Sequence, residues 1–167
     1  MCNLTPNAVV MNFYDYLVGK AEIDDVVKIV VGAVIIDEHG RILLVKRKLS
    51  DFMGGIYEIP SGNVELGEGI PHALSREIKE ETNLDLRKVV SLVDWFDYQS
   101  RCRKKSRQFN FVVSVECCSA QILLSEHEEY KWAHYSDIEN LSDITSELRN
   151  TLLIAAFTIS QTFETET

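Results

Sequence analysis

Cysteine is scarce in this chain, and the spacing of its cysteines excludes the common disulfide and zinc patterns. The four cysteines are Cys2, Cys102, Cys117 and Cys118. No pair has CxxC spacing, and none is spaced with histidine as in a zinc site. Because disulfides are rare in reducing compartments, we expect reduced thiols in a cytoplasmic protein. Cys117 and Cys118 are predicted to point to opposite faces of one strand.

Long apolar runs and a surplus of basic residues are also absent. No apolar stretch approaches the roughly 20 residues that a membrane-spanning helix needs. The N-terminal residues lack the basic start and apolar run of a signal peptide. The 17 Lys and Arg are outnumbered by 26 Asp and Glu, and the resulting net charge of −9 argues against general binding to nucleic-acid polymers. We therefore expect neither a membrane nor a nucleic-acid polymer as a partner.

Repeats, linkers and low-complexity segments are missing as well, so the 167 residues are predicted to form one domain. We divide the chain into an N-terminal extension (1–26), a folded domain (27–160) and a tail (161–167) that should fray. The extension fits both helical and strand-like patterns. It is interpreted as an extra strand or short helix that covers a sheet, or else as a dimer contact or part of a pocket.

The most informative stretch is the acidic segment 62–84, GNVELGEGIPHALSREIKEETNL. Pro71 suits the first turn of a helix, so we expect a helix from Pro71 to Thr82. At about 100° per residue, its glutamates Glu77, Glu80 and Glu81 share roughly a third of the helix circumference. Such carboxylates repel one another, and a hard cation such as Mg²⁺ or Mn²⁺ would relieve that repulsion. The alternative is a solvated acidic helix face.

The spacing of the whole segment favours the cation site, because it resembles the Nudix box, GX5EX7REUXEEXGU with U a bulky apolar residue. One position departs from the pattern, since Asn83 stands where the box has glycine. Asparagine is the next best residue for a left-handed helix end, so this change affects a helix cap and no carboxylate. The preceding YEIPSG also looks like the usual lead-in. The matching residues are Gly62, Glu68, Arg76, Glu77, Ile78, Glu80, Glu81 and Leu84.

The resemblance to the Nudix hydrolase family, whose MutT-like members are pyrophosphohydrolases, implies an α/β (α+β) fold with a mixed β-sheet sandwiched between helices. It covers roughly residues 27–160. It implies that Glu77, Glu80, Glu81 and the Ser61 carbonyl bind Mg²⁺ or Mn²⁺, and that Glu77 also orients or deprotonates the water. Arg76 is implied to position Glu77 or to pair with Glu68.

A second acidic segment, Ser125 to Trp132, precedes an expected strand from Lys131 to Tyr135. Members of the family commonly place a distal glutamate before a Trp-containing strand, as a metal ligand or catalytic base. By spacing to Trp132 this implies Glu126, with Glu129 next, and an ordinary acidic loop is the alternative. We interpret His127 as a structural hydrogen-bonding residue, since a hard oxygen site does not require imidazole.

Candidate substrate-binding residues are Arg47, Tyr57 and Glu68. Arg47 follows a strand whose end often faces substrate in the family, although a basic residue there is more often solvated. Tyr57 could stack on a base or lie half-buried on the sheet. The basic run Arg101–Arg107 is predicted at a hairpin tip, as a solvated loop or as a segment that attracts polyphosphate.

The remaining pattern predicts strands and one further helix. Val27–Ile36 and Arg41–Lys46 are expected to form a hairpin around the turn Asp37–Gly40. A helix capped by Thr145 is expected to end at Ser160. Further strands are expected at Ile56–Pro60, Leu86–Tyr98 and Gln108–Cys118.

The resemblance implies hydrolysis of a nucleoside diphosphate linked to a group X. Proline and tyrosine markers of other family members are absent after the box, which leaves a (deoxy)nucleoside triphosphate, cleaved to NMP and pyrophosphate, as the default substrate. Alternatives are a nucleotide sugar, ADP-ribose, or a non-catalytic nucleotide-binding sensor. An isomerase would need other catalytic residues. A homodimer is common in the family and is a possible assembly here.

Overall fold

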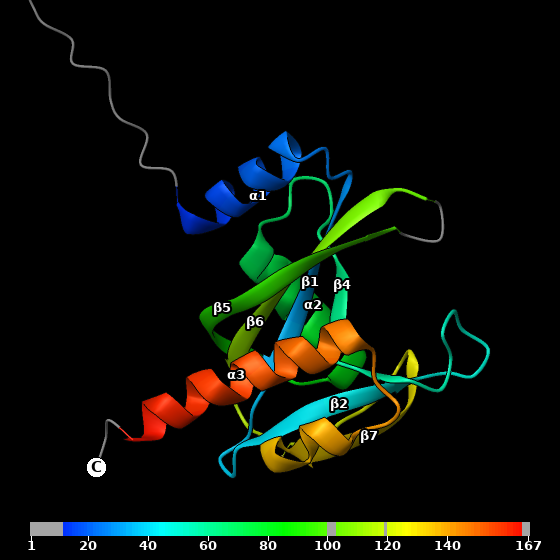
Figure 1. The fold of residues 1–167 in the computed structure, drawn as a ribbon, viewed down its shortest axis with the longest axis vertical. Coiled ribbons are helices and arrows are strands. Elements are labelled where there is room, and N and C mark those ends of the chain that lie inside the picture. Colours follow the sequence, from blue (N-terminus) through cyan, green and yellow to red (C-terminus); the bar gives the residue numbers. More distant parts are fainter. Residues whose placement is uncertain (1–11, 100–102, 119, 165–167) are drawn as a thin grey trace, which may run out of the picture.

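Two β-sheets and their flanking helices make up the part of the chain that the structure describes (Figure 1). The computed structural model describes residues 12–99, 103–118 and 120–164. The helices are α1 (Phe13–Ile23), α2 (Ile70–Thr82) and α3 (Ser146–Glu164), with a short 3₁₀ helix η1 (Tyr135–Asn140). The strands are β1 (Lys28–Ile35), β2 (Arg41–Arg47), β3 (Tyr57–Glu58), β4 (Ser61–Asn63), β5 (Leu86–Gln99), β6 (Lys105–Val115) and β7 (His127–His134).

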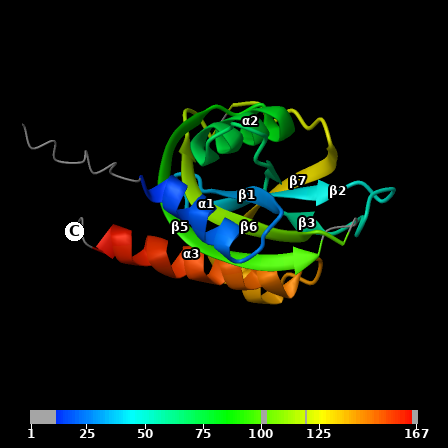
Figure 2. The same cartoon turned by 90° about the horizontal axis from the view of Figure 1, so that it is seen from above.

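The larger sheet is mixed, which confirms the expected α+β architecture. Its strand order is β4-β1-β6-β5, with β1 parallel to β6 and every other pair antiparallel. The smaller sheet, β3-β2-β7, is antiparallel. Figure 2 shows α2 on one side of the strands and α3 on the other, so the strands are sandwiched between helices as predicted.

Two apolar clusters form the core, one on each side of the larger sheet. On the α2 side, Leu74 and Ile78 pack with Phe109 and Phe111 of β6, which confirms the predicted apolar face of α2. On the α3 side, Leu148 and Leu152 belong to a cluster that β2 of the smaller sheet also enters. Burial of these side chains fixes α2 and α3 against the strands. None of the helices in the described residues is long and apolar enough to cross a bilayer.

The N-terminal extension contains a helix, so of the helical and strand-like patterns that its sequence fits, the helical one is correct. The Asn12 side chain accepts a hydrogen bond from the Asp15 N–H and caps α1. Leu17 and Ala21 of α1 are buried in the cluster that also contains α2. Residues 1–11, which include the start of the expected pattern, lie outside the described residues.

The predicted hairpin between the first two strands is wrong. β1 and β2 belong to different sheets and share only the single bridge Ile36↔Ile42. A strand has two edges, and β1 uses both for β4 and β6 whereas β2 uses both for β3 and β7. The turn itself is confirmed: the Asp37 carboxylate accepts hydrogen bonds from the N–H groups of His39 and Arg41, and Gly40 has φ 71°.

Several element ends also differ from prediction. β7 starts at His127, before the expected Lys131, and α3 continues to Glu164 beyond the expected Ser160. β6 ends at Val115, so Cys117 and Cys118 follow the strand. These ends depend on tertiary pairing that local composition does not encode.

Candidate active site

The segment before α2 passes so close to the helix that only glycine fits at its centre. A Cβ placed on Gly62 would lie 1.9 Å from Glu77 Cδ, far inside van der Waals contact. Gly62 belongs to β4, at the edge of the larger sheet. The Glu77 carboxylate is therefore held directly over the sheet edge by the close packing of α2.

Arg76 joins the loop to the helix through several charge-assisted hydrogen bonds. Its guanidinium donates to both Glu68 oxygens, at 3.0 and 2.8 Å, and to Glu77 Oε1 at 2.6 Å. It also donates to Glu80 Oε2 at 3.3 Å and to the Asn63 carbonyl at 2.8 Å. The hydrogen bonds from Arg76 lower the pKa of Glu68 to about 2. Arg76 thus pairs with Glu68 and orients Glu77 at the same time.

Glu81 is the most buried carboxylate of the segment, with 4% of its surface exposed. Its Oε2 accepts a hydrogen bond from the Ser61 N–H at 2.9 Å. Burial raises the pKa of Glu81 to about 9, and the negative charges of Glu58, Glu77 and Glu126 act in the same direction. Burial likewise raises the pKa of Glu77, and the favourable contact with Arg76 does not offset it.

This donor set fits a hard divalent cation by its chemistry. Hard cations take oxygen ligands. The Arg76 guanidinium contacts both Glu77 and Glu80, and Glu81 contacts Ser61, the residue with the predicted carbonyl donor. The mutual repulsion of these carboxylates is the electrostatic condition that a divalent charge would relieve. The described residues do not hold three or more ligand side chains in ready coordination geometry. In this arrangement Arg76 donates a hydrogen bond to Glu77, and the Ser61 N–H donates one to Glu81.

The two candidate glutamates of the second acidic segment, Glu126 and Glu129, have different surroundings. The charge of Glu126 acts on both Glu77 and Glu81. The preceding residue fixes this approach, because Ser125 Oγ donates to the Glu80 carbonyl at 2.7 Å. Glu129 lies on β7, where it accepts hydrogen bonds from the Tyr57 hydroxyl and from Lys46 Nζ.

Glu58 is a site residue that the sequence interpretation missed. It accepts two hydrogen bonds from Arg47 Nη1, at 3.1 and 3.0 Å, and lies 2.9 Å from His127 Nε2. His127 thus makes the expected structural contact. Glu58 also raises the pKa of Glu81 through its charge. The signal was its place in the YEIPSG lead-in, where only its neighbour was considered as a side chain.

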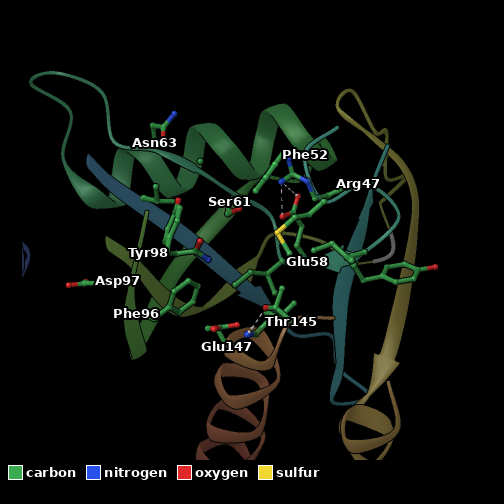
Figure 3. Close-up of a pocket in the computed structure, with 18 of the residues that line it drawn as sticks. Arg47, Phe52, Glu58, Ser61, Asn63, Phe96, Asp97, Tyr98, Thr145 and Glu147 are labelled. Atoms are coloured by element: carbon green, nitrogen blue, oxygen red, sulfur yellow. Dashed lines mark hydrogen bonds and ion pairs between the residues drawn. The ribbon is translucent and has the colours of Figure 1, made fainter. Parts of the chain in front are cut away.

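A cavity of about 640 Å³ adjoins this cluster of charges (Figure 3). Figure 3 shows Phe96 and Tyr98 of β5 on one side, Arg47 and Phe52 on another, and Thr145 and Glu147 at the start of α3 below them. Ser61 and Gly62 also line the cavity, so it reaches the edge where Glu77 lies. A ligand in this cavity would therefore lie beside the candidate metal site.

Only two of the three predicted substrate-binding residues line the cavity. Arg47 and Tyr57 line the cavity, but Glu68 is not among the described lining residues and is engaged by Arg76. Tyr57 is buried, and Lys131 Nζ lies 3.6 Å from the centre of its ring. Stacking of a base on Tyr57 therefore finds no support in this geometry.

The basic run Arg101–Arg107 is only partly a loop. Residues 101 and 102 lie outside the described part of the chain. Arg107 lies on β6, is buried, and pairs with Asp24 at 2.9 Å and Asp97 at 2.6 Å. Because its charge is already paired, Arg107 is not available to attract a polyphosphate.

Comparison with known proteins gives a consistent picture. The family model described as the NUDIX domain matches residues 27–153. An ADP-ribose pyrophosphatase of Methanocaldococcus jannaschii is 35% identical over 107 residues, which are 64% of this chain and 60% of that protein. An 8-oxo-dGTP diphosphatase of Proteus vulgaris is 37% identical over 57 residues, 34% of this chain and 51% of that protein. The chain thus spans less than two thirds of either relative.

Solved structures agree on the fold. A MutT protein from Methanosarcina mazei Go1 has a TM-score of 0.64 and 25% sequence identity, over 75% of this chain and 89% of that one. A C. elegans Ap4A hydrolase has a TM-score of 0.66, over 81% of this chain and 99% of that one. At 22% identity, the second likeness concerns the fold alone.

Proposed function

The chain belongs to the Nudix family, and from this premise we propose that it is a metal-dependent pyrophosphohydrolase acting on a nucleoside diphosphate linked to a group X. The observation that carries the proposal is the position of Glu77. Its carboxylate lies over Gly62, is oriented by Arg76, and faces an edge that lines a cavity of about 640 Å³. A nucleotide in this cavity would bring its phosphates next to the acidic cluster.

Glu77, Glu80, Glu81 and the Ser61 carbonyl would hold Mg²⁺ or Mn²⁺. When bound, the metal supplies a water of lowered pKa and neutralises charge on the phosphate oxygens. Arg76 keeps Glu77 in position through the contact at 2.6 Å. We assign Glu126 as the group that takes a proton from the attacking water, because its negative charge acts on Glu77 and Glu81 and because Ser125 fixes its segment to α2.

Arg47 is a cationic side chain that lines the cavity and contacts the acidic residue Glu58. Its Nε is buried without a hydrogen-bond partner among the described residues, while Nη1 is held by Glu58. A buried donor without a partner is costly, and a phosphate oxygen would satisfy it. This supports Arg47 as a substrate contact.

The leading substrate is a (deoxy)nucleoside triphosphate, cleaved to NMP and pyrophosphate. ADP-ribose is the second candidate, favoured by the 35% identity to the Methanocaldococcus jannaschii ADP-ribose pyrophosphatase. Both contain the diphosphate bond that the proposed chemistry attacks, and they differ in X.

The test is a product-release assay on the purified protein with Mg²⁺ and then Mn²⁺. The panel holds NTPs, dNTPs, oxidised dGTP, ADP-ribose, dinucleoside polyphosphates and nucleotide sugars, with products separated by chromatography. EDTA-sensitive release of NMP supports the proposal, and the second product identifies X. Nucleotide binding without turnover of any substrate would instead indicate a sensor.

A further inference from the structure

The floor of the cavity is one face of the larger sheet. Side chains paired across neighbouring strands point to the same face. The register of β4, β1, β6 and β5 aligns one row across the sheet: Asn63, Val30, Gln108 and Phe96. All four line the cavity. The adjacent row on this face is Ser61, Gly32, Asn110 and Asp94.

A chain of hydrogen bonds connects these two rows. Gln108 Nε2 donates to Asn110 Oδ1 at 2.9 Å. Asn110 Nδ2 in turn donates to Asp94 Oδ1 at 2.8 Å, and Thr151 Oγ1 donates to Asp94 Oδ2 at 2.9 Å. Asn110 and Thr151 are fully buried. We call Gln108, Asn110, Asp94 and Thr151 the amide relay.

The relay allows only one orientation of each amide. An aspartate carboxylate accepts hydrogen bonds and donates none, so Asn110 must turn its NH₂ group toward Asp94. Its carbonyl then faces Gln108, which must present its own NH₂ group in return. This leaves the Gln108 carbonyl oxygen for a ligand in the cavity. The orientation of the Gln108 amide is thus fixed by Asp94, a partly buried aspartate that is not among the described residues lining the cavity.

Gly32 provides independent support that the relay is a built feature. A Cβ on Gly32 would lie 2.3 Å from Asn110 Oδ1 and 2.8 Å from Gln108 Nε2. The two amides therefore occupy the space that any other residue would fill. Gly32 lies within β1 and has no unusual φ, so close approach is the reason for glycine here.

We propose that Gln108 is a specificity-determining residue, whose carbonyl oxygen selects a nucleobase with an exocyclic amino group, adenine or cytosine, over hypoxanthine or uracil. The inference rests on the proposed function, since it concerns the nucleotide of that reaction. Phe96 lies beside Gln108 in the same row and Phe52 lines the cavity from the 48–56 loop. These rings supply apolar surface for a planar base, and the Gln108 oxygen accepts from its amino group.

The test compares adenine and hypoxanthine, which differ at C6 by an amino and an oxo group. AMP and IMP binding is measured by calorimetry, and kcat/KM is measured for the adenine and hypoxanthine forms of whichever substrate is turned over. We expect wild-type protein to prefer adenine by at least about tenfold. Gln108→Met, which keeps the bulk and removes the carbonyl, is expected to bring the ratio close to one. Gln99→Met, at another lining position outside the relay, should retain it.

Asp94→Asn tests the relay itself. An amide at residue 94 can donate as well as accept, so Asn110 and Gln108 can turn over together and present an NH₂ group to the cavity. We expect the adenine preference to fall or reverse without loss of overall nucleotide affinity. A purely structural role of Asp94 would lower stability and leave the ratio unchanged.

The outcomes separate this inference from the proposed function. Equal wild-type use of adenine and hypoxanthine nucleotides, or a ratio that survives in Gln108→Met, would overturn the role of Gln108 while hydrolysis stands. If the protein binds nucleotides with a selectivity that depends on Gln108 but turns none over, the role of Gln108 stands and the proposed hydrolase activity is contradicted. Failure to bind or cleave any adenine or cytosine nucleotide would overturn the role of Gln108 as well.

Discussion

The carboxylate of Glu77 occupies the position that a side chain at Gly62 would need. The two are so close that a Cβ on Gly62 would lie 2.0 Å from Glu77 Oε1. This contact explains why the first residue of the acidic segment is glycine even though its φ is ordinary. A substitution at Gly62 would therefore displace the Glu77 carboxylate without changing the chemistry of Glu77 itself.

Gly62→Ala is therefore expected to lower kcat by at least about tenfold, because a misplaced group loses catalytic efficiency steeply, while the fold is retained. Steady-state kinetics and thermal unfolding measure the two effects. Gly19→Ala is the matched control, since a Cβ there meets nothing within 4 Å. It lies inside α1, so it should raise helix stability by up to about 1 kcal/mol and leave kcat unchanged. Wild-type activity in Gly62→Ala would argue against the role of this contact.

The placement of Glu126 and Glu129 predicts different effects for two neighbouring glutamates. Glu126→Gln should lower kcat by about 10²–10⁴-fold if Glu126 is the general base. Glu129→Gln removes a partner of Tyr57 and Lys46, and should affect stability more than kcat. Initial rates at saturating metal and substrate distinguish them. A larger loss of kcat in Glu129→Gln would reverse the assignment.

Asp37 predicts a pH-dependent contribution to stability. Burial would raise the pKa of Asp37, but hydrogen bonds from the Arg41 and His39 N–H groups and from the Arg41 guanidinium outweigh it and lower the pKa. A lowered folded-state pKa stabilises the protein above the unfolded-state value of about 3.9, and this contribution is lost as the pH falls through the folded-state pKa.

Asp37→Asn should consequently destabilise the protein most at neutral pH. The difference in unfolding free energy between wild type and variant should shrink as the pH falls below about 4. Denaturant unfolding at several pH values provides the measurement. Glu38→Gln, an exposed neighbour, serves as the control. A difference that grows toward acid pH would contradict this sign.

The ion pairs of Arg107 predict that this residue stabilises the fold. The sequence alone had suggested that the basic run could attract the substrate. Arg107 joins Asp24, just after α1, to Asp97 of β5. Arg107→Met removes the main cationic partner of Asp24 and Asp97 and should lower the free energy of unfolding. KM for a polyphosphate substrate should change little. A raised KM with an unchanged free energy of unfolding would instead support the hypothesis that the basic run attracts the substrate.

The local sequence predicted the helix that carries the acidic residues better than it predicted the strands around that helix. The carboxylates, the α2 helix and its left-handed end at Asn83, with φ 63°, follow from local spacing and capping rules. The separation of β1 and β2 into two sheets does not, because adjacent strands look like a hairpin until their other partners are known. Glu58 was missed for a similar reason, since its contacts with Arg47 and His127 join residues far apart in the chain.

The amide relay was also invisible in the sequence. Gln108, Asn110 and Asp94 are ordinary polar residues in two predicted strands, and only the register places them in adjacent rows above Gly32. Register depends on long-range pairing, which no single strand pattern determines.

The most direct test of the central claim is EDTA-sensitive release of NMP by wild-type protein and by Glu77→Gln. Glu139→Gln, at an exposed position remote from the acidic cluster in sequence, is the control. We predict that Glu77→Gln folds like wild type by circular dichroism and loses at least about a hundredfold in kcat, whereas Glu139→Gln keeps full activity. Wild-type turnover in folded Glu77→Gln, or release that persists in EDTA, would contradict the account.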